Sequence, residues 1–81
     1  MHCVIYKSNK KYDTYIYVEK EDNFDRVPGT LMKLLGKLEF VMTLELNPER
    51  ALAQADPTQV IESLQTQGYF LQLPPKSYVS D

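Results

Sequence analysis

The residues of this chain that could carry chemistry are few, and most lack a partner at a useful spacing. His2 and Cys3 are its single histidine and single cysteine. Cysteine catalysis needs a base within hydrogen-bond reach of the thiol, but neighbouring residues on a strand point to opposite faces of the sheet. We therefore predict no Cys/His catalytic pair. A structural zinc site, which needs four ligands, is not expected either.

Other chemical patterns are weak. The three glycines, at 29, 36 and 68, have neither GxGxxG nor Walker A spacing, so no phosphate-binding loop is predicted. One acidic stretch could offer oxygen ligands to Mg²⁺ or Ca²⁺, but it lacks the spacing and turn glycine of an EF-hand loop, and a solvated loop is the favoured interpretation; its residues are Glu19, Glu21, Asp22 and Asp25.

Two further carboxylates lie in the alternating stretch 37–46. Glu39 and Glu45 are expected to share one strand face about 20 Å apart, too far for a general acid/base pair. They suit an edge strand that must avoid pairing with other sheets. Because no nucleophile, base and orienting group can be assembled from these residues, we predict no enzymatic activity, no catalytic residues, no metal and no cofactor.

A basic loop is the one candidate interaction site, formed by Lys7, Lys10, Lys11 and Tyr12. Lysines interleaved with an aromatic ring are typical of surfaces that hold single-stranded RNA or DNA. The whole chain, however, has a net charge of −2 and a pI near 5.3, so no overall basic field attracts nucleic acid or an anionic membrane. An unknown protein partner is therefore the first expectation, and nucleic acid is the alternative.

Residue patterns predict the elements that position these side chains. Val, Ile and Tyr runs predict strands, whereas Asp56 as N-cap, Pro57 at N1 and Gly68 at C′ delimit a helix. The expected elements are strands over 3–8 and 14–20, a helix over 26–36, a strand over 37–46, a weak helix over 47–55, a helix over 56–68 and a strand over 69–73. This ββαβααβ order predicts an α+β domain with a small mixed or antiparallel sheet flanked by helices.

The stretch "YDTYIYVEK" raises the question of whether its tyrosines bind a ligand or pack in the core. The first two strands read "CVIY" and "YIYV", nearly continuous apolar runs that are typical of strands covered on both faces. We therefore expect Ile16 and Val18 to meet one helical layer. Tyr15 and Tyr17 should lie under the other layer, with their hydroxyls at its rim.

Length and composition indicate one small folded unit. The chain has 81 residues, 43% hydrophobic and 25% charged, which fits a single globular domain over 1–75 followed by a loose tail over 76–81. No charged and apolar leader or long apolar span is present, so neither secretion nor membrane insertion is predicted. Together with a single cysteine, this favours a cytoplasmic protein.

Several segments resemble the YcgL domain family of small gammaproteobacterial proteins. They are "CVIYKS", "TYIYVEK", "DRVP", "LMKLLG" and "QGYFLQLPP", and in this order they span Cys3 to Pro75. The resemblance implies a compact α/β/α sandwich in bacterial cytoplasm, and it supplies no activity and no site residues. We therefore expect a non-enzymatic protein-interaction or regulatory module.

Overall fold

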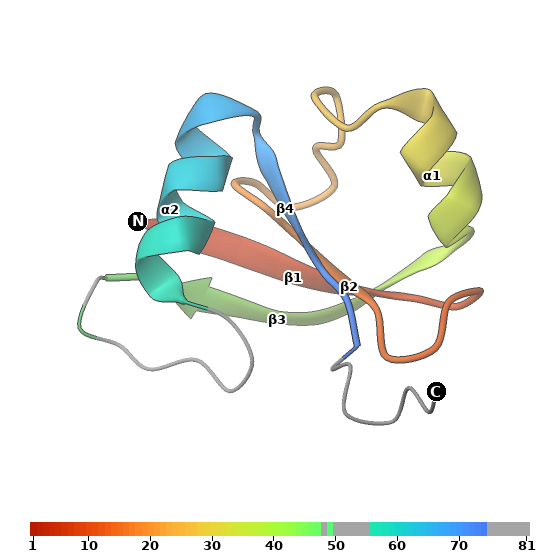
Figure 1. The fold of residues 1–81 in the computed structure, drawn as a ribbon, viewed down its shortest axis with the longest axis horizontal. Coiled ribbons are helices and arrows are strands. Elements are labelled where there is room, and N and C mark those ends of the chain that lie inside the picture. The colour runs from red at the N-terminus through yellow and green to blue at the C-terminus, as the bar shows by residue number, and fades with distance from the viewer. Residues whose placement is uncertain (48, 50–55, 75–81) are drawn as a thin grey trace, which may run out of the picture.

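The computed structural model describes residues 1–47, 49 and 56–74 of the chain (Figure 1). Its elements are, in chain order, β1 (His2–Ser8), β2 (Tyr15–Val18), α1 (Gly29–Leu35), β3 (Leu38–Glu45), α2 (Pro57–Thr66) and β4 (Tyr69–Gln72). The expected α+β class is confirmed. The expected helix over 47–55 and the tail over 76–81 lie largely or wholly outside the described residues.

The described strands form one antiparallel sheet in the order β3-β1-β2-β4. The strands predicted over 3–8 and 14–20 correspond to β1 and β2, which form an antiparallel hairpin at the centre of the sheet. β3 and β4 are its two edges. Figure 1 shows α2 beside the N-terminal end of β1 and α1 beside its other end. No helix in the described part of the chain has the length and apolar character needed to cross a bilayer.

Two apolar cores lie on opposite faces of the sheet, because successive residues of a strand alternate between its faces. One core packs alternate sheet residues against α2, and its buried members are Cys3, Ile5, Tyr17, Leu44, Leu46, Val60 and Leu64. The other packs the intervening residues against α1 and the loop before it, and its buried members are Val4, Tyr6, Ile16, Val18, Val27 and Leu35. This arrangement is the α/β/α sandwich implied by the resemblance.

The tyrosines of β2 are core residues. Tyr17 is 5% exposed, its hydroxyl donates to Gln72 Oε1 at 2.6 Å, and its ring meets Phe70 edge-on at 5.5 Å. Tyr15 is half-buried against the same core. Ile16 lies on the opposite face, as predicted.

The limits of α2 follow the sequence signals. Asp56 Oδ1 accepts a hydrogen bond from the Thr58 backbone N–H at 3.0 Å, and Pro57 is the first helical residue. Gly68 follows the helix with a φ of +90°, a backbone region that L side chains rarely adopt. Its N–H donates to the Ser63 carbonyl at 3.1 Å. The predicted start and end of this helix are confirmed.

α1 differs slightly from its prediction. It begins at Gly29, so Pro28 precedes the helix and does not lie in its first turn. Leu35 is buried and Leu31 packs against the same core, but Leu34 is 50% exposed. The apolar stripe read from the sequence is therefore divided between the core and the surface.

The residues that alternate along the stretch 37–46 do not keep one face of the sheet, because β3 contains a bulge. Ile5 pairs with Met42 while Tyr6 pairs with Phe40, so Val41 is an extra residue without an opposite neighbour. Such an insertion reverses which residues face each side. Leu38 therefore packs in the α1 core and Leu44 in the α2 core.

The same bulge corrects the expectation for the two glutamates of this strand. Glu39 lies opposite Lys7 and Glu45 lies opposite His2. Because Lys7 and His2 are an odd number of residues apart on a regular strand, they point to opposite faces. Glu39 and Glu45 therefore lie on opposite faces of β3 and do not share one.

Candidate interaction surface

The four residues predicted for interaction lie together at the hairpin end of the sheet. They surround one hollow of about 390 Å³, whose lining residues are Lys7, Ser8, Asn9, Lys10, Lys11, Tyr12, Asp13 and Glu39. Tyr12 is 82% exposed. The structure therefore gathers three cationic side chains and an open aromatic ring on one surface.

Hydrogen bonds through Ser8 and Asn9 hold this loop in a defined shape. Ser8 Oγ accepts from the backbone N–H groups of Lys10 and Lys11 at 3.1 and 2.9 Å and donates to the Leu35 carbonyl. Asn9 and Lys37 exchange two further bonds, through Asn9 N–H to the Lys37 carbonyl and Lys37 N–H to Asn9 Oδ1. The loop is thereby fastened to the end of α1.

This contact adds two lysines that sequence reasoning missed. Lys10 Nζ donates to the Lys33 carbonyl at 3.5 Å, and Lys37 is bonded to the loop backbone. Among the described residues, the backbones of Lys33 and Lys37 thus adjoin Lys7, Lys10 and Lys11 at this end, and the carboxylates that line its hollow are Asp13 and Glu39. A locally basic end exists on a chain whose net charge is −2. Only the clustering of lysines around "LMKLLGK" could have indicated it.

An apolar hollow of about 350 Å³ adjoins the basic end, lined by Lys11, Tyr12, Thr14, Leu34, Leu35, Leu71, Leu73 and Pro74. Leu34 is 50% exposed and Leu73 is 62% exposed. Leu35 is buried in the α1 core, whereas its neighbour Leu34 is exposed and lines this hollow. Two exposed leucines beside an exposed tyrosine form a patch, whereas single exposed apolar residues need no explanation.

A second hollow, of about 610 Å³, follows the outer edge of β4. It is lined by Pro28, Thr30, Leu31, Leu34, Ser63, Gln67, Tyr69, Phe70 and Leu71. Consecutive strand residues point to opposite faces, so a space that contacts Tyr69, Phe70 and Leu71 must lie at the strand edge, between α1 and α2. It shares Leu34 and Leu71 with the first apolar hollow. We call the two together the β4 groove.

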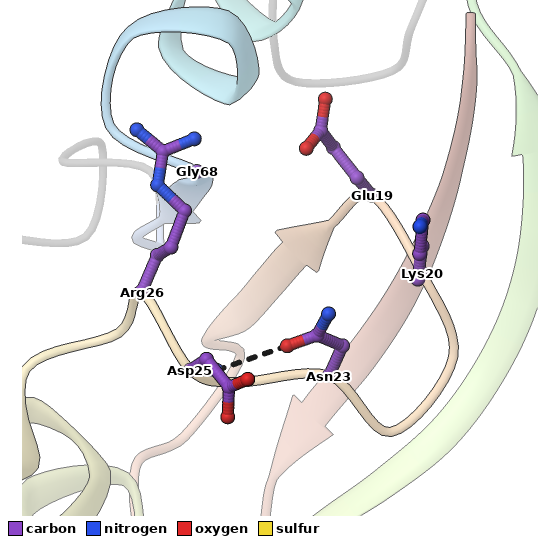
Figure 2. Close-up of a pocket in the computed structure, with 6 residues that line it drawn as sticks. All are labelled: Glu19, Lys20, Asn23, Asp25, Arg26 and Gly68. Atoms are coloured by element: carbon purple, nitrogen blue, oxygen red, sulfur yellow. Dashed lines mark hydrogen bonds between the residues drawn. The ribbon is translucent and has the colours of Figure 1, made fainter.

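A polar hollow of about 300 Å³ lies at the opposite end of β2 and is lined by Glu19, Lys20, Asn23, Asp25, Arg26 and Gly68 (Figure 2). Arg26 Nη2 donates to the Thr66 carbonyl at the end of α2 at 3.0 Å. The same side chain lies across Gly68, where an added Cβ would come within 2.6 Å of Arg26 Cδ. Arg26 therefore links the loop after β2 to the end of α2 beside this hollow.

The four acidic residues of 19–25 do not gather at one site. Some make contacts within the fold, and Glu21 is exposed to solvent. The Asp22 backbone N–H donates to the Tyr6 hydroxyl at 2.8 Å, and burial is the main reason that the pKa of Tyr6 is raised. Glu19 and Asp25 line the polar hollow, where Asn23 Oδ1 accepts from the Asp25 N–H at 3.1 Å. Within the described ranges, no three His, Cys, Asp or Glu side chains gather as a metal site would require.

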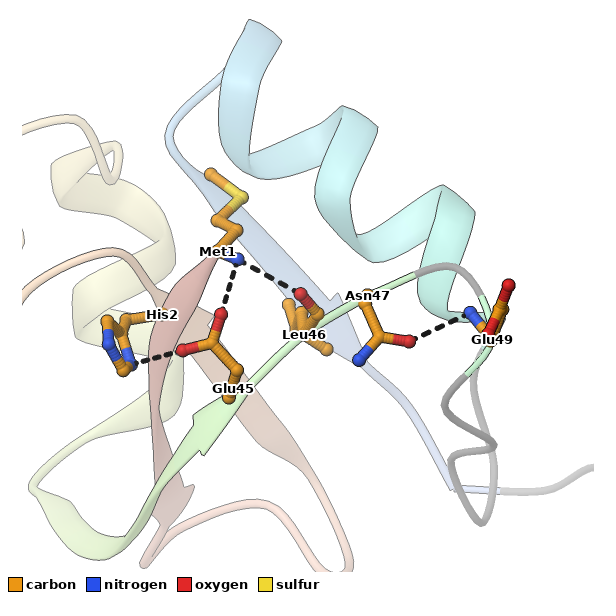
Figure 3. A network of polar contacts seen from close by, with 6 residues as sticks. All are labelled: Met1, His2, Glu45, Leu46, Asn47 and Glu49. Carbon is orange, nitrogen blue, oxygen red and sulfur yellow. Dashed lines mark hydrogen bonds and ion pairs between the residues drawn. The ribbon is translucent and has the colours of Figure 1, made fainter.

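A small polar network joins the start of β1 to the end of β3 (Figure 3). Glu45 accepts a hydrogen bond from the Met1 amino group at 2.8 Å, and His2 Nδ1 lies 2.9 Å from Glu45 Oε1. The hydrogen bond from the amino group is the main reason that the pKa of Glu45 is lowered. Cys3 is fully buried, and burial raises the pKa of its thiol to about 11. Exposed His2 and buried Cys3 lie on opposite faces, as predicted.

Known proteins share this sequence over most of its length. A family model for the YcgL domain matches residues 3–75. A YcgL domain-containing protein of Thioalkalivibrio sulfidiphilus is 46% identical over 77 residues, which are 95% of each chain. Protein YcgL of Escherichia coli is 51% identical over 75 residues, 93% of this chain and 69% of that protein.

One relative is much longer. A protein of Nitrosococcus oceani, named as a HAD-like hydrolase, is 57% identical over 76 residues, which are 94% of this chain but 20% of that protein. The chain therefore spans one fifth of the length of this relative. Four fifths of the longer protein have no counterpart here.

Proposed function

We propose that this chain, which belongs to the YcgL domain family, is a non-enzymatic module that binds another protein through the β4 groove. The observation that carries this proposal is the exposed apolar surface along an edge strand. Leu34 and Leu73 remain half or more exposed, and half-buried Leu71 lies beside them in the same hollow.

Apolar surface left in water forgoes roughly 25 cal/mol for each Å² that could be buried, and a small domain has little stability to spare. A grouped patch beside an edge strand is typical of a surface that another protein covers. The longer Nitrosococcus relative supports the proposal, because a closely similar sequence there forms part of a larger protein.

Single-stranded nucleic acid is the second candidate, and the basic end is the observation that favours it. Tyr12 is 82% exposed among the lysines of the hairpin hollow. Tyr15 and Tyr17, however, pack against the α2 core, so one ring is left in this strand-and-loop segment for base stacking. Oligonucleotide-binding surfaces usually stack several bases in succession.

Affinity capture with matched variants tests the proposal. Tagged wild type, Leu34→Asp and Val41→Asp are each used to capture partners, with and without nuclease. Val41 is the control because it is also exposed but lies on β3, the other edge. We expect a protein that wild type and Val41→Asp retain after nuclease treatment and that Leu34→Asp loses.

Two results would contradict this proposal. Equal recovery of the same proteins by Leu34→Asp would show that the groove is not the interface. Recovery that disappears with nuclease, and that weakens steeply between about 50 and 200 mM salt, would make the basic end a nucleic-acid surface.

A further inference from the structure

We infer that the groove receives an extended peptide segment of a partner protein, rich in apolar and acidic residues, which adds a fifth strand beside β4. This inference rests on the proposed function and specifies its partner. It follows from the space at the strand edge, the backbone groups there, the apolar walls and the local charge.

The space fits a strand. β4 pairs with β2 on one side, and no other described strand pairs with it. The hollow of about 610 Å³ lies on its other side, between residues of α1 and α2. Neighbouring strands are about 4.8 Å apart, so a segment placed there would be covered on one face by α1 and on the other by α2.

The backbone at this edge already accepts a hydrogen bond from outside the sheet. Gln67 Nε2 donates to the Tyr69 carbonyl at 3.1 Å, and Gln67 is exposed. An incoming backbone N–H could take the place of this side-chain donor. Strand addition of this kind obtains affinity from main-chain hydrogen bonds and specificity from pockets for alternate side chains.

The apolar hollow supplies such a pocket. Leu71 and Leu73 lie two residues apart and line this hollow together with Leu34 of α1. An apolar side chain of the added strand would enter between these leucines. An amphipathic helix would use a groove differently, through side chains spaced three and four residues apart, and would make no main-chain hydrogen bonds to the strand edge.

Charge complementarity selects an acidic segment. Lys11 lines the apolar hollow itself, and four more lysines lie at the adjoining basic end. A lysine of the hairpin loop pairs favourably with a carboxylate on the correct partner. Basic segments and second copies that bring their own lysines to this edge would be repelled.

Selection from a library of random linear peptides tests the inference, with the full-length protein as bait. We expect enriched peptides that alternate apolar with acidic residues. N-methylation at alternate backbone positions of one such peptide should abolish its binding. Leu73→Asp and Lys11→Glu should each weaken its affinity by about tenfold or more. Lys20→Glu is the control, because Lys20 lines the separate polar hollow.

Other outcomes would overturn the inference, and they separate it from the proposed function. Enriched peptides with helical spacing or with basic residues would contradict this inference. No enrichment, while groove-dependent protein capture succeeds, would also contradict it but would leave the proposed function standing. If groove-dependent capture also fails, both proposals fall. Slow hydrogen exchange of the Leu71 amide without any peptide would show that the edge is already filled by this chain or by a second copy.

Discussion

Single polar side chains fix the loops of this domain to its core. Ser8 holds the hairpin loop against α1, and the Tyr6 hydroxyl holds the loop after β2 through Asp22. Arg26 binds the end of α2 and lies across Gly68. These contacts explain why the segments "DRVP" and "QGYFLQLPP" are linked in space although they are far apart in sequence.

Gly68→Ala is expected to lower the free energy of unfolding by about 1 kcal/mol or more, because Ala avoids positive φ and its Cβ would displace Arg26. Denaturant titration measures this change. Gly29→Ala is the matched control, since nothing lies within 4 Å of its added Cβ. A midpoint for Gly68→Ala equal to that of Gly29→Ala would contradict this role of Gly68.

Cys3 is expected to be an inert core residue. Its thiol is fully buried, and a pKa of about 11 leaves almost no thiolate at pH 8, the form that reacts. A thiol reagent should modify native protein far more slowly than protein unfolded in denaturant. Comparable rates in the two states would return Cys3 to the list of functional candidates.

Both faces of the central strand β2 are apolar because Tyr17 packs in the α2 core while Ile16 and Val18 pack in the α1 core. Tyr17→Ala removes a buried ring and should destabilise the domain by about 3 kcal/mol or more, whereas half-buried Tyr15 should cost less. Tyr12→Ala should remain within about 0.5 kcal/mol of wild type, because its ring is exposed. These values come from denaturant unfolding, and full stability of Tyr17→Ala would refute its place in the core.

The bulge in β3 makes a second prediction at this scale. Deletion of Val41 should be tolerated, because it restores one-to-one pairing and leaves Phe40 and Met42 on their present faces. Deletion of Ile16 from central β2 is the control, since it would turn Tyr17 and Val18 toward the wrong cores. Thermal unfolding distinguishes the two, and loss of the folded state on deletion of Val41 would contradict the assigned register.

The sequence predicted those helix and strand limits that are set by residues close to them in the chain. Asp56, Pro57 and Gly68 act within their own turns of chain, so the limits of α2 could be predicted. The bulge at Val41 could not, because an uninterrupted alternation conceals an insertion that only the partner strand β1 reveals. The helical spacing of Leu34 likewise suggests a core residue. In the structure, Leu35 packs in the core and Leu34 is exposed.

The sequence indicated only the part of the candidate site whose residues are close together in the chain. Lys7, Lys10, Lys11 and Tyr12 are close in sequence, and the structure does bring them together. The contribution of Lys33 and Lys37 depends on how α1 docks against the hairpin loop. The β4 groove depends on both helices and an edge strand, so no local pattern could indicate it.

For the whole molecule, the two sheet edges differ in character. β3 exposes Phe40, Val41 and Met42, but it is interrupted by a bulge and carries Glu39 and Glu45, features that discourage strand pairing. β4 is flanked by apolar residues of both helices and lies near the basic end. This asymmetry is the reason to assign partner binding to β4.

Site-specific photocrosslinking tests that assignment most directly. A photoreactive amino acid is placed at Leu73, which lines the β4 groove, or at Met42, which is exposed on β3. Irradiation of cells that contain either variant is followed by identification of the adducts. We predict a protein adduct from position 73 that position 42 does not give. Identical adducts from both positions, or none from position 73, would contradict an interface at β4.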